Sequence, residues 1–382
     1  MLNWLRRRPP AETKAARALV AWHQPGRPAW SGRDPAAYAR EGYAKNAVAH
    51  RCVRLIAEAA ASAPLKVAPR DHPLAALFAR PNAEQTGTEL LEAFFGHLQV
   101  AGNAYLEAAS FEDGPPEEIF VLRPDRMAVI PGARGWPVGW EYRVGAEVRR
   151  YMRDPLTEDA PILHLKTFHP LDDWYGQSPM EAAACAIDIH NAGGAWNKAL
   201  IDNSARPSGA IVFQSGQRAS EEQFQRLREE IEATLAGAGN AGRPMLLEGG
   251  LDWRPMSLTP SDMDFIEARN AAAREIALAF GVPPMLLGIP GDNTFSNYRE
   301  ANLAFWRHVA LPLAQKLARA LENWLGHRWS EAGPACVCVD LDAIPALSAE
   351  REGTWARLEA ASFLTRDEKR RLAGVDDAEV AP

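Results

Sequence analysis

The 382-residue sequence lacks several features that would assign it to a common class of protein. No apolar run approaches the roughly 20 residues that a membrane span needs, so no transmembrane helix and no membrane partner are expected. The basic N-terminus, MLNWLRRRPP, has no apolar stretch of the kind found in signal peptides, which leaves secretion unsupported. The chain also has fewer basic than acidic residues. Its net charge of −7 argues against a generally basic surface that would hold nucleic acid tightly.

Cysteine is scarce, with only four in the chain. Cys336 and Cys338 alternate along an expected strand and therefore share one face, but two ligands do not make a zinc site. Cys52 and Cys185 stand alone. We therefore expect reduced thiols, no metal and no cofactor.

Signatures of catalysis are missing as well. The chain contains no Gly-x-Ser-x-Gly elbow and no His-x-x-x-His pair, and its Gly-Ala-Gly segment at 237–239 does not follow an expected strand. The nearest approach to an active site is His164 with Asp172, a pair that could serve as a general base. Polar side chains at the end of a strand explain these residues better, so we expect no enzyme. A monomeric soluble enzyme using this region stays the alternative.

The most organised stretch of the chain lies between residues 261 and 326. Apolar residues at helical spacing predict one helix over 261–280, which Gly281 and the prolines after it should end. A second helix follows over 298–327, where Pro312 should produce a kink. Between them lies a loop with a polar tip at 290–294. This pattern fits an ordinary helical hairpin, and it equally fits a loop that lines a channel or gates a site.

The other segments mix helices and strands, which predicts an α+β fold. Amphipathic helices are expected at 46–61 and 88–100, and an alanine-rich helix at 180–203. Short strands separated by turn residues fill 118–165, a compact α/β insert spans 206–258, and a late strand is expected at 336–341. Residues 1–35 are rich in arginine and proline and are expected to form a flexible arm.

A family resemblance rests on an ordered set of short motifs across residues 45–330. The main one is Ala-Leu-Ala-Phe-Gly-Val-Pro-Pro-Met-Leu-Leu-Gly at 277–288, followed by Thr-Phe-Ser-Asn-Tyr at 294–298. Supporting motifs are 49–67, His-Pro-Leu at 72–74, Arg-Pro-Asn at 80–82, Gly-Asn-Ala-Tyr at 102–105, Leu-Arg-Pro at 122–124 and Tyr-Gly-Gln-Ser-Pro at 175–179. In this order the motifs closely resemble the portal proteins of tailed bacteriophages, of the siphophage type also found in gene transfer agents. The chain is short for that family, with an abbreviated C-terminal region.

The resemblance implies a division of the chain into the parts of a portal subunit. These are a flexible arm (1–35), a wing (36–176, to which 328–342 returns), stem helices (177–205 and 259–281), a clip (206–258), a tunnel loop (282–297), a long kinked helix of the wing (298–327) and a short helical crown (343–382).

The resemblance also implies a function. Copies of the chain would form a ring, usually a dodecamer, at the unique capsid vertex of a virion or gene-transfer-agent particle assembled in the host cytoplasm. Double-stranded DNA would be packaged through the ring by the terminase large subunit and ejected through it later. The ring would also contact the major capsid protein and carry the head-completion or adaptor protein of the tail. A capsid adaptor without a channel is a further alternative.

Three groups of site residues follow from this division. The tunnel loop residues that we expect at the DNA channel are Gly291, Asp292, Asn293, Thr294 and Phe295. Stem packing is assigned to Trp196, Leu200, Phe265 and Ile276, and docking of terminase or neck proteins on the clip to Glu229, Arg243 and Trp253. Because a conduit must let a polyanion slide, we expect an acidic ring with Asn293 and Thr294 near its axis.

Overall fold

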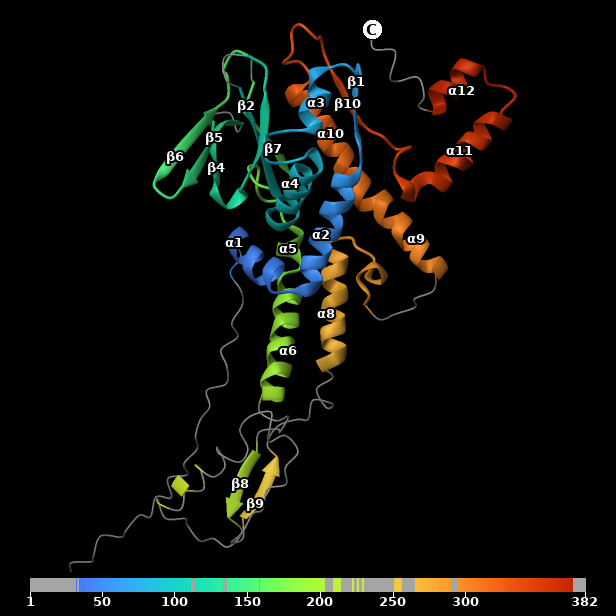
Figure 1. Ribbon diagram of the computed structural model, residues 1–382. Helices are drawn as coiled ribbons and strands as arrows, with labels where there is room; N and C mark the ends of the chain where they lie inside the picture. Colours follow the sequence, from blue (N-terminus) through green and yellow to red (C-terminus); the bar gives the residue numbers. More distant parts are fainter. Residues whose placement is uncertain are drawn as a thin grey trace, which may run out of the picture. The chain divides into compact units, whose positions relative to one another are not determined.

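The computed structural model describes residues 32, 34–110, 114–132, 136–157, 159–202, 209–213, 222, 225, 226, 229, 251–255, 265–289 and 295–373 (Figure 1). Helices and small antiparallel sheets alternate along this part of the chain, which confirms the predicted α+β class. Membership in the α+β class follows from the segregated antiparallel pairing, since no parallel strand pairs occur among the described residues.

The first long helices begin and end where capping chemistry predicts. α2 (Ala47–Ser62) starts after Asn46, whose side chain accepts two backbone N–H groups of the first turn. α4 (Gly87–Ala101) starts with a capping box built on Thr86 and stops at Gly102, where φ is 70°. These local signals fix the helix ends before any packing is considered.

The largest core lies between α2, α4 and α10 (Leu311–Leu325), with the short α3 (Pro73–Ala79) beside it. Phe94 and Phe95 of α4 are fully buried there with their rings edge to face. The two-stranded sheet of β1 (Leu65–Ala68) and β10 (Cys336–Val339) closes this core. Antiparallel pairing of β1 with β10 brings residues near 338 back to the region formed by residues 47–106.

Two three-stranded antiparallel sheets complete the region. Their strands are β2 (Asn103–Ala109), β3 (Glu118–Leu122) and β7 (Ile162–Lys166) in the order β3-β2-β7, and β4 (Met127–Pro131), β5 (Pro137–Val144) and β6 (Glu147–Met152) in the order β4-β5-β6. A smaller core of aromatic side chains, including Tyr105, Trp140 and Tyr151, joins the two sheets.

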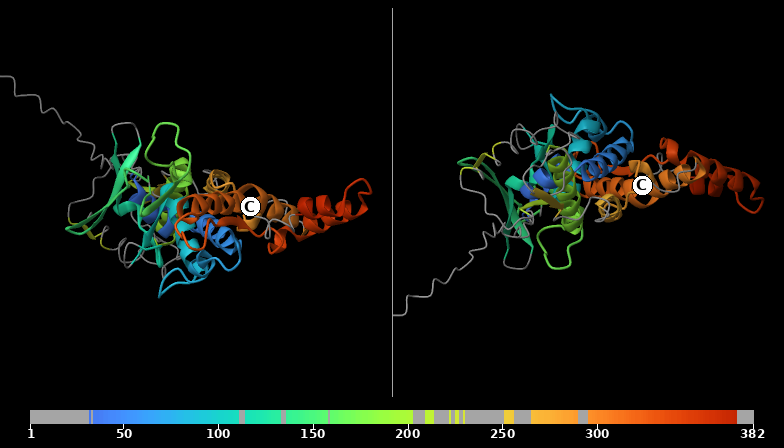
Figure 2. Two further views of the ribbon diagram at one scale, coloured as in Figure 1. Left: turned by 90° about the horizontal axis from the view of Figure 1, so that it is seen from above. Right: turned by 90° about the horizontal axis from the view of Figure 1, so that it is seen from below.

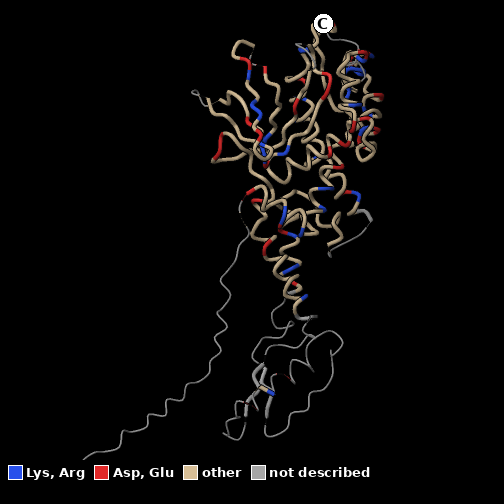
Figure 3. The backbone as a smooth tube through the Cα atoms, turned by 60° about the vertical axis from the view of Figure 1, so that its left-hand side comes forward, with Lys and Arg blue, Asp and Glu red and all other residues tan. Residues whose placement is uncertain are grey.

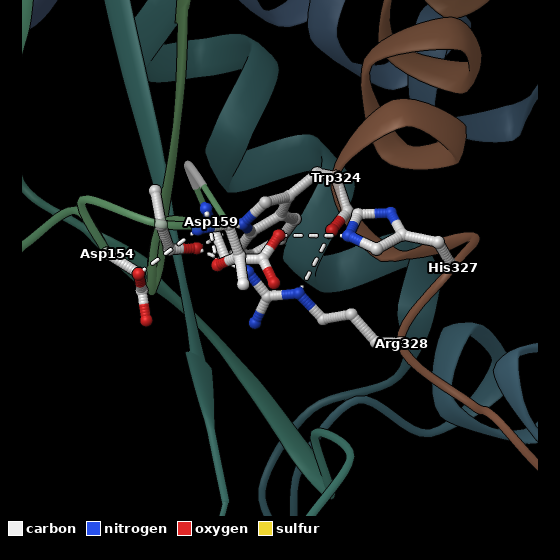
Figure 4. A network of polar contacts seen from close by, with 7 residues as sticks. Asp154, Asp159, Trp324, His327 and Arg328 are labelled. Atoms are coloured by element: carbon white, nitrogen blue, oxygen red, sulfur yellow. Dashed lines mark hydrogen bonds and ion pairs between the residues drawn. The ribbon is translucent and has the colours of Figure 1, made fainter.

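A polar cluster attaches the end of α10 to the segment between β6 and β7 (Figure 4). The carbonyl of Ala160 accepts the indole N–H of Trp324 at 2.7 Å and a guanidinium N–H of Arg328 at 2.6 Å. The Nε2 atom of His327 lies 2.9 Å from Asp159 Oδ1. Burial lowers the pKa of Arg328. The guanidinium group of Arg328 lies over the ring of Trp324. These contacts connect the sheet that contains β7 to the end of α10.

The long helix that the sequence predicted over 298–327 is divided into three parts. α9 (Phe295–Phe305) passes into a π-helical turn at Trp306–Ala310, and α10 then begins at Leu311. Pro312 therefore lies in the first turn of α10, where its missing N–H and its ring disturb the hydrogen bonds of the preceding turn. The irregular turn precedes the proline by a few residues instead of centring on it.

The remaining elements are short or end the chain. They are α1 (Pro35–Ala37), a π-helical turn η1 (Tyr38–Ala44), η2 (Pro124–Arg126), η6 (Pro345–Leu347), α11 (Ser348–Ala360) and α12 (Arg366–Ala373). In the insert, β8 (Gly209–Phe213) pairs with β9 (Leu251–Pro255). The strand expected at 244–248 and most of the helix expected at 220–236 lie outside the described residues.

Candidate functional site

Two antiparallel helices form the centre of the candidate site. α6 (Ala184–Asp202), preceded by the single turn α5 (Pro179–Ala182), packs against α8 (Phe265–Ala279) (Figure 1). Ile276 of α8 is completely buried, in a core that also contains Met180 and Ile187. The helix expected at 180–203 is thus present with a break at Ala183.

A polar network crosses the upper part of this helix pair. His190 of α6 is 8% exposed, and its Nδ1 atom lies 3.1 Å from the side-chain nitrogen of Asn46. The same amide of Asn46 donates to Asn191 Oδ1, while Asn46 Oδ1 caps α2. The capping bonds fix the orientation of the amide, so its N–H group faces Nδ1 of His190, which accepts from it in one of the two neutral tautomers. The network therefore ties the start of α2 to α6.

Arg269 of α8 approaches the same histidine from the other side. Its Nε atom lies 3.3 Å from His190 Nε2. A neutral imidazole has a single acceptor nitrogen, so only one of its two neighbours donates a full hydrogen bond at a time. Burial, and then the charge of Arg269, lower the pKa of His190. His190 is therefore neutral near pH 7 in the folded chain.

A second junction joins α4, β2 and the start of α5 through two motifs that are 73 residues apart. Asn103 Oδ1 accepts the N–H of Gly176 at 2.8 Å, and the Asn103 amide donates to the carbonyls of Ala101 and Gly176. Ser178, which caps α5, donates its hydroxyl to carbonyls at the end of α4. The Gly-Asn-Ala-Tyr and Tyr-Gly-Gln-Ser-Pro motifs are thus one interlocked structure.

Glycine is required on both sides of this junction. A Cβ atom on Gly102 would lie 2.4 Å from the carbonyl oxygen of Gly176, and one on Gly176 would lie 2.1 Å from the carbonyl oxygen of Gly102. Gly102 also has a positive φ of 70°. The two backbones approach each other as closely as they do because neither residue has a side chain.

His164 and Asp172, the candidates for a general base, have structural roles. The ring of His164 is stacked on Tyr105 at 4.2 Å, and its Nε2–H donates to Asn103 Oδ1 at 3.0 Å. Burial, and then the charge of Lys166, lower the pKa of His164 to about 3. Asp172 Oδ1 accepts the backbone N–H groups of Trp174 and Tyr175. Neither side chain is arranged to move a proton for the other.

Residues 281–289, directly after α8, form an ordered cap and turn. Gly281, with φ 67°, and Val282 donate to the carbonyls of Leu278 and Ala277, which is a Schellman cap. After the turn η4 (Pro284–Leu287), Ile289 packs on α8 and is only 7% exposed. Of the 282–297 segment assigned to a tunnel loop, 282–289 therefore lie folded against α8, and 295–297 belong to α9.

The other predicted site residues are only partly described. Gly291, Asp292, Asn293, Thr294 and Arg243 lie outside the described residues. Phe295 is the first residue of α9, while Leu200 and Phe265 are in α6 and α8 without described side chains. Trp196 is half-buried, Glu229 is exposed, and Trp253 lies in β9 opposite Ile211. Sequence reasoning did not find the Asn103 and His190 networks, because their partners are brought together only by the fold.

Two further features of the described part of the chain bear on its chemistry. None of its helices combines the length and apolar character that a bilayer span needs. Within the same residues, no cluster of three or more histidine, cysteine, aspartate or glutamate side chains is arranged to hold a metal ion.

Comparison with known proteins gives consistent matches along most of the chain. The family described as "Phage portal protein" matches residues 47–374. A protein of Rickettsia bellii (strain RML369-C) is 40% identical over 343 residues, which are 88% of each chain. The portal protein of Enterobacteria phage HK97 is 28% identical over 72% of this chain and 66% of its own. A chain of the structure titled "Neck of native GTA particle computed with C12 symmetry" is 52% identical, with a TM-score of 0.69, over 92% of this chain and 96% of that chain.

Proposed function

Because this chain belongs to the phage portal protein family, we propose that twelve copies of it form a closed ring with an axial channel for double-stranded DNA. A portal is a connector between the capsid and the neck of a particle. The observation that carries the proposal is the match to a chain in a particle neck with twelvefold symmetry, at 52% identity over 92% of the sequence. The same match supports a place for the ring at the portal vertex of a virion or gene-transfer-agent particle.

The α6–α8 pair is the stem of the proposed ring. Its two antiparallel helices are anchored to the rest of the subunit, since Ile276 and Ile187 are buried in a core shared with α2 and the His190 network connects α6 to the start of α2. The charged residues in the sequence of the two helices are nearly balanced, with the acids Asp188, Asp202, Glu267 and Glu275 and the bases Lys198, Arg269 and Arg274. Figure 3 shows the same interspersion of both signs along the described backbone. A wall without a net basic stripe favours sliding of DNA over tight binding.

The tunnel loop of the proposed channel is the short segment 290–294. Its flanks are anchored, because Ile289 is buried against α8 and α9 begins at Phe295. The sequence of this segment is polar, which suits contact with a rod such as DNA. We assign Asn293 and Thr294 to the side of this segment that approaches the axis.

Each part of the proposed subunit would bind different partners. The clip, which contains β8 and β9, would dock the terminase large subunit during packaging and the head-completion or adaptor protein afterwards, through the surface of Glu229, Arg243 and Trp253. The wing would contact the major capsid protein. The protein's role in this scheme is structural and not catalytic, in line with the structural roles of His164 and Asp172.

Assembly and passage of DNA are tested separately. Light scattering and electron microscopy of the purified chain should give a particle of about twelve times 41.9 kDa with a central hole. A monomer would restore the enzyme alternative, and an annulus without a hole would indicate an adaptor. Deleting 290–295 should leave rings intact and impair packaging or genome retention. Packaging at the wild-type level by the deletion variant would remove the tunnel-loop assignment.

A further inference from the structure

Two large apolar side chains stand almost fully exposed on the loop between β7 and α5. Phe168 is 84% exposed and Leu171 is 91% exposed. Both side chains project from one loop, three positions apart, and we call them together the apolar projection, which is a candidate for coverage by another protein.

The loop around these residues is held in a defined shape. The carboxylate of Asp172 accepts two backbone N–H groups, His169 Nδ1 accepts the N–H of Leu171, and the Lys166 ammonium donates to the carbonyl of Asp173. The hydroxyl of Tyr175 accepts the N–H of Val129, which fixes the loop to β4. A projection that is already ordered loses little conformational entropy when it binds.

A groove of about 470 Å³ lies between η1, α2 and α4. Its walls consist mainly of apolar and small side chains, among them Tyr43, Val53, Ala57, Ala93 and Val100. Gly96 also lines it, in the interior of α4, where glycine costs about 1 kcal/mol relative to alanine. A Cβ atom on Gly96 would meet no other atom within 4 Å, so nothing within the described chain requires a glycine there.

The loop after β7 and helix α2, which forms one wall of the groove, lie on opposite sides of the molecule. Viewed from above and from below, the lime-green loop lies on one side and the blue α2 lies on the other (Figure 2). The loop of one copy therefore does not reach the groove of the same copy. In a cyclic ring every copy presents one face to the next copy and a different, complementary face to the previous one.

We propose that the loop with Phe168 and Leu171 inserts into the α2–α4 groove of the neighbouring copy and forms a contact between subunits of the ring. This inference rests on the proposed function, since it takes the ring as given. It names the second copy of the chain as the occupant, and it accounts for the glycine at position 96, which leaves room for the incoming side chains.

Engineered disulfides test the contact directly. The double variant L171C/G96C should give a ladder of covalent multimers on non-reducing gels after mild oxidation. Each single variant should give no ladder beyond the wild-type background from the exposed Cys185, Cys336 and Cys338, because this contact pairs two different sites. Rings that yield no ladder from the double variant would overturn the contact and leave the proposed function standing. If the double variant gave a ladder while the wild-type chain formed no closed ring, the contact would stand and the proposed function would be overturned.

Charge placed on the projection provides an independent measurement. We expect F168D/L171D to remain folded, since both side chains are exposed, and to lower the fraction of chain in rings at least tenfold by native mass spectrometry. The matched control is F363D, which changes a side chain that is also 84% exposed but lies between α11 and α12. Equal assembly of the two variants would contradict the proposal. Circular dichroism checks that both are folded.

Discussion

Replacing Asn103 with alanine should destabilise the protein by about 4 kcal/mol and loosen the start of α5. The N–H of Gly176 and the Nε2–H of His164 would both lose their acceptor, Asn103 Oδ1. Asn103 is 5% exposed, so water does not replace that acceptor without a rearrangement. A buried polar group left without a partner costs about 1–3 kcal/mol, and two such groups give the estimate.

Urea denaturation at one fixed protomer concentration measures this loss, since the stability of an assembly depends on concentration. The control is N323A, which removes an exposed asparagine from α10. Hydrogen exchange should show in addition faster exchange at 175–182 in N103A than in the control. A loss below about 1 kcal/mol for N103A, with unchanged exchange, would refute the view that Asn103 joins the two motifs.

Two further predictions concern the same junction. Because the pKa of His164 is about 3 in the folded chain and near its ordinary 6.5 in the unfolded chain, the unfolded chain binds one more proton between these values. Stability should therefore fall by about 2 kcal/mol from pH 7 to pH 5, and H164Q should remove this part of the dependence in denaturation curves recorded at both pH values. G176A should give insoluble or unfolded protein, because its methyl group would lie 2.1 Å from the carbonyl oxygen of Gly102. G353A, in a helix position with no atom near the added methyl group, should be at least as stable as the wild type in thermal melts, and equal solubility of the two variants would contradict the argument.

Helix ends and fold class were predictable because their signals are local. Asn46, Ser178 and Gly281 each satisfy or terminate backbone hydrogen bonds within a few residues, and each helix boundary lies beside them in the structure. The short strands likewise follow from hydrophobic patterning along single segments, but the pairing of β1 with β10 does not, because it joins two segments that are far apart in the sequence.

The role of His164 was not predictable from its type or its sequence neighbours. Its chemistry is set by Tyr105, which lies directly opposite in the antiparallel register of β2 and β7, and by Asn103. The fold of 282–289 was missed for the same reason: the prolines indicated a break, but the burial of Ile289 depends on the surface of α8. In both cases the deciding contact lies far away in the sequence or across a packing interface.

The junction of Gly102 and Gly176 connects α5 and α6, the proposed stem, to the sheet of β2 and β7 in the proposed wing. The direction in which α5 and α6 leave the sheet is fixed by three hydrogen bonds between the Asn103 side chain and the backbone of Ala101 and Gly176, by the Ser178 cap and by a backbone approach that excludes any side chain. On the other side, Asn46 and His190 hold α6 to the start of α2. Because α6 is restrained at two places by polar groups that are costly to leave unpaired, we expect a change in the proposed ring contact at α2 and α4 to shift α6 as well. Coupling of this kind would appear as a changed rate of hydrogen exchange in α6 of the F168D/L171D variant. An unchanged rate would show that α6 and the subunit contact act independently.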